Sequence, residues 1–519
     1  MDTNEKNIVA IDLGSSKIAL TVAKVMGNDA QIIYHRETPS SGIRYSSVFN
    51  VTHVAQPLSQ IISQAEEDLG IKITQAVVGM PKFPVYQENS NATINDRGVD
   101  TDITNEDIAA LKDFALSIYP LQDTSKEAIF GAVAQSFSDG ENFQLIENDI
   151  IGMASDTLEG NFKIFIGKKN DLRKIDSVMC KCGIAAMRKY FTAESTAKAV
   201  LTDSEMENGV ALVDFGGGCT SVSIYHGNIM RHYASIPFGG RNITQDIKSE
   251  CQISESLAEN IKKAFGACMP DKLQSLSDKI IHIKSNGIEP DKQLPVKYLS
   301  EIITARVEEI MMGILYEIEK SGFADKLRSG IVVTGGCAKI ANLGNLIYDI
   351  SGYKVRIGNP KKCFSCIDCE DVAKPSSAAS MGLLISALND RTVGCTVEAS
   401  TNRILTEVVT ETGREMTVEM NVEDNAEEVE VQQNEEVPEQ QNEEVLEQQN
   451  EGVGEAGTEE NPQGTIWPES EVEKVEPIKK EKKKRGNSII RVTFTKIKKT
   501  VTDGLLELYQ DIAADDSNE

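Results

Sequence analysis

The chain has 519 residues, too many for a single hydrophobic core, and its 80 acidic and 53 basic residues give a formal net charge of −27. This acidic excess argues against a general nucleic-acid binder, so no nucleic-acid partner is expected. Because no apolar run approaches the ~18 residues of a spanning helix and the first residues are polar, we expect neither a membrane span nor a secretory signal, and we interpret the ten cysteines as reduced thiols.

The charge is uneven and divides the sequence at about residue 397. The charged residues are distributed as 24 acids and 3 bases in 398–476, 10 bases and 1 acid in 477–499, and 6 acids without a base in 500–519. Before this point, apolar spacing predicts strands at 7–13 and 17–25 and helices at 53–69 and 298–321. The region at about 78–168 shows short strands and a helix at 105–118. A folded α/β body with a long polar tail is therefore expected.

The first chemical signal is a strand that ends in a carboxylate and a Gly/Ser turn, in the sequence IVAIDLGSSK at 8–17. Backbone N–H groups of such a turn can bind phosphate oxygens, and a strand-end Asp can hold Mg²⁺ directly or through water. The candidate residues are Asp12 for the metal and Gly14, Ser15, Ser16 and Lys17 for the phosphates. Taken alone, the motif could equally be a plain hairpin with a polar turn.

The same motif recurs at 210–224, which read VALVDFGGGCTSVSI. Two such hairpins can clamp a triphosphate from two sides. A third segment, 330–343, contains a strand that runs into two glycines and a helix start, where a base or ribose can approach the backbone closely. The candidate residues of these two segments are Asp214, Gly216, Gly217, Gly218, Cys219 and Thr220, and then Gly335, Gly336 and Cys337.

These three motifs, in this order, resemble the actin-like ATPase superfamily, which includes actin, the heat-shock chaperone ATPases, the sugar kinases, MreB and FtsA. The resemblance implies an α/β fold in which two ribonuclease-H-like lobes surround a nucleotide cleft. It also implies ATP and Mg as cofactors.

Within the superfamily, three further segments resemble the FtsA family of cell-division proteins: IPFGGRNITQDI at 236–247, LAENIKKAFG at 257–266 and PSSAASMGLLISAL at 375–388. The resemblance implies that Glu259 contacts the ribose and that Lys262 lies near the base. An ordinary exposed helix pair, spaced i and i+3, is the alternative for these two residues. The Gly-rich turn departs from the family's usual GGGT because Cys219 intervenes, which removes no backbone N–H.

The resemblance also implies a domain order. The expected units are a first part of lobe 1 at 1–77, a small α+β subdomain of the FtsA type (1C) at 78–168, the return of lobe 1 at 169–207, lobe 2 at 208–394 with a helical part at about 240–325, a disordered acidic linker at 395–476, a basic segment at 477–488 and an amphipathic helix at 489–512.

Catalysis is expected to depend on positioning and on the metal. Glu194, in the segment ESTAKA, matches the glutamate that orients the attacking water in the chaperone and MreB relatives, with Asp12 and Asp214 around the metal. The alternative is that Glu194 only flanks a helix. We expect slow Mg-dependent ATP hydrolysis at most, with the nucleotide acting mainly as a conformational switch.

A second candidate metal site is the C-x-x-C-x-x-C pattern of Cys363, Cys366 and Cys369. Thiolates at this spacing can hold Zn²⁺. No fourth ligand stands nearby in the sequence, so a loop that only carries thiols is the preferred interpretation.

The tail has two parts with different chemistry. Three polar octads at 432–455 predict a disordered tether, because they cannot bury enough surface to offset chain entropy. The basic run at 479–485 precedes a segment whose apolar residues share one helical face, a pattern typical of an interfacial membrane helix. The apolar face comprises Ile490, Phe494, Ile497, Val501, Leu505, Leu508 and Ile512. A groove on a partner or on the protein itself is the alternative binding site for this helix.

The resemblance implies a peripheral protein on the cytoplasmic side of the inner membrane. It would form filaments at the division site, hold FtsZ there, and meet later division proteins, with anionic lipid bound through the C-terminal helix. A PilM-type pilus-assembly ATPase is the first alternative, and a sugar-kinase or chaperone-type ATPase is the second. Both share the fold, but neither accounts for the lipid-seeking tail.

Overall fold

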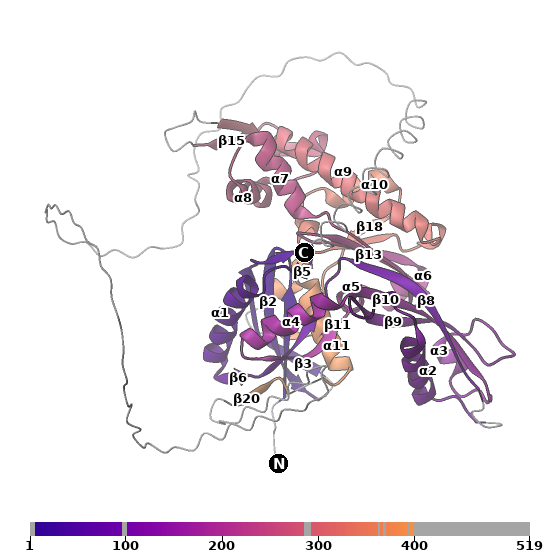
Figure 1. Cartoon of the computed structure of the whole chain (residues 1–519). Helices are drawn as coiled ribbons and strands as arrows, with labels where there is room; N and C mark the ends of the chain where they lie inside the picture. Colours follow the sequence, from indigo (N-terminus) through magenta and orange to yellow (C-terminus); the bar gives the residue numbers. More distant parts are fainter. Residues whose placement is uncertain are drawn as a thin grey trace, which may run out of the picture.

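The computed structural model describes residues 6–27, 29–95, 101–284, 292–361, 364–366, 370–392 and 394–398. Figure 1 shows two α/β lobes, one above the other, with a smaller subdomain beside them. The predicted disordered linker, basic segment and amphipathic helix lie outside the described residues, except for the first few residues of the linker. Among the described helices, none is long and apolar enough to cross a membrane.

The first lobe is built on a six-stranded sheet, with α1 and α4 on one face and α5 and α11 on the other. In sheet order its strands are β11 (Ala185–Tyr190), β7 (Gln75–Gly79), β1 (Asn7–Leu13), β2 (Lys17–Met26), β3 (Asp29–Pro39) and β19 (Ser365–Cys366). Its covering helices are α1 (Val51–Leu69), α4 (Lys169–Lys181), α5 (Thr192–Val200) and α11 (Ala378–Asn389). β1 is apolar and buried on both faces, as a strand between two helical layers must be.

Local sequence explains where α1 begins and ends. Asn50 caps its first turn by accepting a hydrogen bond from the backbone N–H of His53, and Gly70 ends it in the left-handed conformation. Short elements complete this lobe: β4 (Ile43–Arg44), β5 (Ser47–Val48), β6 (Ile71–Ile73) and β20 (Thr396–Glu398). The strands predicted at 7–13 and 17–25 are confirmed, and the helix predicted at 53–69 begins two residues earlier.

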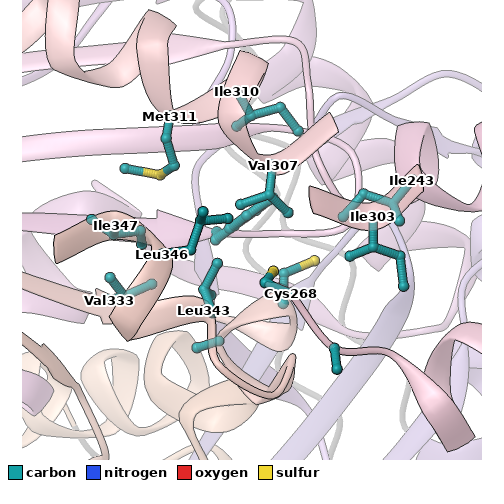
Figure 2. Packing of buried hydrophobic residues seen from close by; sticks show 14 of the residues in the cluster. Ile243, Cys268, Ile303, Val307, Ile310, Met311, Val333, Leu343, Leu346 and Ile347 are labelled. Atoms are coloured by element: carbon teal, nitrogen blue, oxygen red, sulfur yellow. The ribbon is translucent and has the colours of Figure 1, made fainter. Parts of the chain in front are cut away.

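The second lobe has a five-stranded sheet and a long helix, α9 (Val296–Lys320), that packs across it. In sheet order the strands are β14 (Ile229–Ile236), β13 (Thr220–His226), β12 (Val210–Phe215), β17 (Ile331–Thr334) and β18 (Val355–Ile357). The other elements are α6 (Asp203–Asn208), α7 (Gly240–Cys251), α8 (Glu255–Phe265), α10 (Leu343–Ser351), β15 (Ile280–Ile283) and β16 (Lys292–Pro295). Figure 2 shows Ile303, Val307 and Ile310 of α9 in the same apolar core as Val333 of β17 and Leu346 of α10.

The small subdomain is a three-stranded antiparallel sheet in the order β8 (Val85–Ile94), β10 (Leu158–Lys168) and β9 (Glu127–Ser138). The helices α2 (Asn105–Ile118) and α3 (Glu147–Ile150) belong to it, and α2 has the bounds that the sequence predicts. A capping box between Thr104 and Asp107 fixes the start of α2. The sheet lies beside β14 of the second lobe, where Gln87 accepts a hydrogen bond from the Tyr233 N–H at 2.8 Å.

The end of the folded body differs from the expected boundaries. After β18 the chain returns to the first lobe, where β19 pairs with β3 and α11 packs against α5 and β1. Cys395 is buried, and β20 pairs with β6. The predicted range 208–394 for lobe 2 therefore includes β19 and α11, which belong to the first lobe. The folded body also continues through β20, so the predicted linker start at 395 is about one short strand too early. A sequence pattern indicates a helix but not the lobe against which the helix packs.

Candidate functional site

A cavity of about 460 Å³ lies between the two lobes, and the three glycine-containing motifs all line it. The first hairpin contributes residues 12–17, the second contributes Asp214 and residues 216–219, and the segment after β17 contributes residues 335–337. Each motif stands at the end of a buried strand, so the two sheets direct their polar turns into the same space. The helix expected directly after Gly336 is a single 3₁₀ turn, and α10 begins only at Leu343.

The two hairpin turns face each other at close range. A Cβ atom added to Gly217 would overlap with Ser16 Oγ, and one added to Gly218 would lie 2.7 Å from Ser15 Cβ. Glycine is thus required here by the approach of the opposite lobe. Across the same gap, Arg241 of α7 donates a hydrogen bond to the Ser15 carbonyl at 2.9 Å.

The acidic centre of the cavity consists of Asp12 and Asp214, one from each lobe, together with Lys82. Lys82 forms an ion pair with Asp214, and both side chains are largely buried. Burial raises the pKa of Asp12 above its usual value, although Lys82 and Lys17 partly offset this. Burial alone would lower the pKa of Lys82, but the negative groups around it, Asp214 first, raise it overall.

Sequence reasoning did not single out Lys82. The lysine lies just after β7, which runs parallel to β1, so the ends of these two neighbouring strands meet at the same edge of the sheet. That adjacency is the signal that could have identified it. Glu37 of β3 was also missed; it lines the cavity and forms an ion pair with Lys17. Burial alone would raise the pKa of Glu37, but hydrogen bonds from His35 and Lys17 lower it to about 2.

Polar residues of α8 form another wall of the cavity. Lys262 donates hydrogen bonds to the Gly240 carbonyl and to Thr244 Oγ1, both at 2.8 Å, and pairs with Glu259 at 2.6 Å. Burial alone would raise the pKa of Glu259, but Lys262 outweighs it and the pKa is lowered. Cys337 faces this wall, and burial raises the pKa of its thiol to about 11, so it remains protonated. A charged pair fixed in this way offers donors and acceptors to a ribose or a base.

Two of the predicted residues do not line the cavity. Glu194 lies on α5, pairs with Lys198 at 2.9 Å and is 40% exposed, whereas Thr192 of the same helix faces the cavity. Two residues along a helix rotate a side chain by roughly 200°, so Glu194 points away from the side of α5 that faces the cavity. Thr220 is fully buried and donates to the Phe238 carbonyl at 2.8 Å. Of the three cysteines considered for zinc, only Cys366 is among the described residues, and it is exposed.

The acidic centre fits a magnesium ion. Mg²⁺ prefers oxygen ligands and is usually held by one or two carboxylates plus substrate phosphates, and Asp12 and Asp214 supply two carboxylates in one cavity. Within the described ranges, no group of three or more His, Cys, Asp or Glu side chains could hold a metal alone. A metal at this centre would complete its coordination with water or with the phosphates of a ligand.

Comparison with known sequences identifies one family. A profile of the family described as cell division protein FtsA matches residues 211–382. The curated protein named cell division protein FtsA from Borreliella burgdorferi is 30% identical over 379 residues, which cover 73% of this chain and 90% of that protein. The protein of the same name from Neisseria meningitidis is 28% identical, covering 75% of this chain and 91% of that protein.

A solved structure shows the same fold. The structure titled PilM-PilN type IV pilus biogenesis complex aligns with a TM-score of 0.53 and 13% identity, covering 73% of this chain and 98% of the matched chain. At this identity the likeness concerns the fold alone.

Proposed function

Because the chain belongs to the FtsA family of cell division proteins, we propose that it is a nucleotide-controlled anchor that holds FtsZ filaments on the cytoplasmic face of the membrane at the division site. The observation that carries this proposal is the pair of hairpin turns, one from each lobe, that face each other across one cavity. A ligand with several phosphates would join the lobes there, and its presence would change how they are held together. Each lobe has an apolar core of its own, and a third apolar cluster connects the two lobes, so a change in how one lobe is held can reach the other.

ATP with Mg²⁺ is the proposed ligand. The backbone N–H groups of residues 14–16 and 216–219 would hold the phosphates, and Glu259 and Lys262 would face the ribose and base. Asp12 and Asp214 would hold Mg²⁺, which supplies positive charge to the phosphates. The described carboxylates at the cavity all lie beside lysines. We therefore expect hydrolysis to be slow and the nucleotide to act mainly as a switch.

Membrane binding is proposed for residues 489–512, which lie outside the described residues. If its seven apolar side chains were each half-buried in lipid, they would give about 5–8 kcal/mol of gross transfer energy at ~25 cal/mol per Å². Ordering the helix removes much of this, although preceding lysines add about 1 kcal/mol each near anionic lipid. One copy would thus bind weakly and reversibly, and a filament with many copies would bind firmly through avidity. Nucleotide-dependent assembly would in this way set residence on the membrane.

The proposed partners are FtsZ, further copies of the chain, anionic lipid and later division proteins. FtsZ would bind the part of the second lobe at about 240–325, which includes α7, α8 and α9. A PilM-type role in pilus assembly remains the alternative, and the similar fold of the PilM–PilN structure favours it to that extent. An octad tether with a terminal amphipathic segment has no clear use in that role.

Cosedimentation of FtsZ with anionic liposomes tests the proposal. We expect the full chain with Mg–ATP to carry FtsZ into the liposome pellet, and a chain truncated after residue 488 to leave FtsZ in the supernatant. Leu505→Gln on the apolar face should weaken the effect, whereas Glu507→Gln on the polar face should not. Equal recruitment of FtsZ by the full and truncated chains would overturn the membrane role. No recruitment of FtsZ by the full chain would favour the pilus-type alternative.

A further inference from the structure

We propose that, in the absence of nucleotide, the ammonium group of Lys82 pairs with the Asp214 carboxylate and so competes with the divalent metal for it. Mg²⁺ can then bind Asp214 only when the Lys82 side chain is displaced. The inference rests on the proposed function to the extent that a metal–nucleotide complex is the natural ligand. It adds a residue that controls when the metal can bind.

The ion-pair pattern of the cavity singles out Lys82. Lys17 pairs with Glu37, and Lys262 and Lys263 pair with Glu259. Lys82 pairs with Asp214, and its positive charge also acts on Asp12 and Cys219. Only 14% of the Lys82 side chain and 10% of that of Asp214 are exposed, so water screens this pair weakly.

The main chain of Lys82 is held from both lobes. Its N–H donates to Ser46 Oγ of the first lobe at 3.1 Å, and its carbonyl accepts from the Tyr233 hydroxyl of β14 at 2.6 Å. Displacement of the ammonium group therefore requires rotation of the side chain rather than movement of the backbone. Four rotatable bonds give the lysine side chain this freedom.

Electrostatics explains why a lysine lies beside the two carboxylates and why its side chain must move when Mg²⁺ binds. Asp12 and Asp214 lie close enough to repel each other in a buried site, so a nearby positive charge lowers the cost of having both ionised. A magnesium ion brings two positive charges and requires compact octahedral coordination by oxygen atoms at about 2.0–2.1 Å. An ammonium group in contact with the same carboxylate repels the ion and blocks one of its ligands. The phosphates that arrive with the metal offer the released ammonium group new oxygen partners.

The proposal predicts weak binding of Mg²⁺ in the absence of nucleotide. Lys82→Met keeps the length of the side chain and removes the charge, so we expect the full-length variant to bind Mg²⁺ about tenfold more tightly than the unmodified chain, measured by calorimetric titration with MgCl₂. Lys263→Met is the matched control, because it removes a lysine from another wall of the same cavity, where the lysine pairs with Glu259 and not with Asp214. It should bind Mg²⁺ as the unmodified chain does. Adding Asp214→Asn to Lys82→Met should abolish the gain.

Equal or weaker Mg²⁺ binding by Lys82→Met would overturn the proposal, as would an equal gain in Lys263→Met. If Lys82→Met does not fold, the Lys82→Arg variant tests the competition with Mg²⁺ instead. A guanidinium group holds a carboxylate more firmly than an ammonium group does, so this variant should bind Mg²⁺ more weakly than the unmodified chain, and unchanged or tighter binding would refute the competition. Binding of a fluorescent ATP analogue, measured separately, tests the proposed function: its absence would remove ATP as the ligand and leave the Mg²⁺ comparison valid.

Discussion

Gly218→Ala perturbs the point where the two hairpins meet. The new Cβ atom would lie 2.7 Å from Ser15 Cβ, 2.6 Å from Ser15 Oγ and 3.3 Å from the Tyr45 nitrogen. Rotation of the serine hydroxyl relieves the second contact but not the first, because a Cβ position is fixed by the backbone. Carbon atoms normally approach to about 3.5–4.0 Å, so the turns must separate by about 1 Å.

Overpacking of this kind costs about 1–3 kcal/mol. If nucleotide binds the closed arrangement of the two turns, the same free energy is lost from binding, and the affinity for Mg–ATP should fall by about 5- to 150-fold. Fluorescence titration with an ATP analogue measures this loss. Gly344→Ala on α10 is the control, since a Cβ atom there would meet nothing closer than Val355 Cγ1 at 3.7 Å.

A double variant separates this clash from a general loss of structure. Ser15→Gly removes the opposing Cβ atom, so the pair Gly218→Ala and Ser15→Gly should bind the analogue better than the effects of the two single changes predict when added. Unchanged binding by Gly218→Ala would refute the closed arrangement. Strict additivity in the double variant would show that the two turns do not meet.

Three further predictions concern stability. Arg306 of α9 holds both carboxylate oxygens of Asp246 on α7, at 2.6 and 2.9 Å, so Arg306→Ala should lower the free energy of unfolding by about 1–2 kcal/mol in urea titrations, and no change would contradict this bridge between helices. Ile303→Ala should cost about 2–5 kcal/mol because Ile303 is fully buried, whereas the exposed Tyr316 on the same helix should tolerate alanine; equal effects would contradict the packing of α9. Because the pKa of Glu37 is lowered, the contribution of this carboxylate to stability is complete above pH 4.5 and is lost as the pH falls toward about 2. The difference in unfolding free energy between the unmodified chain and Glu37→Gln should therefore shrink over that pH window, and a constant difference would refute the pairing with Lys17.

The elements that sequence reasoning predicted best are those with a local cause. The two hairpins have apolar strands, a strand-end Asp and glycine turns, all within about fifteen residues, and they form where the pattern places them. The helix α2 carries its own start signal in Thr104 and Asp107. In each case the residues that fix the structure are neighbours in the sequence.

The features that it missed depend on contacts between distant segments. The role of Lys82 follows from the parallel pairing of β1 with β7 and from the approach of Asp214 on the other lobe. Glu194 was a candidate because its segment matched a family motif, whereas the phase of α5 turns Thr192 toward the cavity. The return of α11 to the first lobe depends on its packing against α5, which no local pattern reveals.

A crystal structure of the full chain with Mg²⁺ and a non-hydrolysable ATP analogue tests the central claim most directly. Our account predicts that the phosphates lie between residues 14–17 and 216–219, with the metal beside Asp214 and the ammonium group of Lys82 moved away from that carboxylate. An analogue bound outside this cavity, or in contact with one hairpin alone, would contradict it.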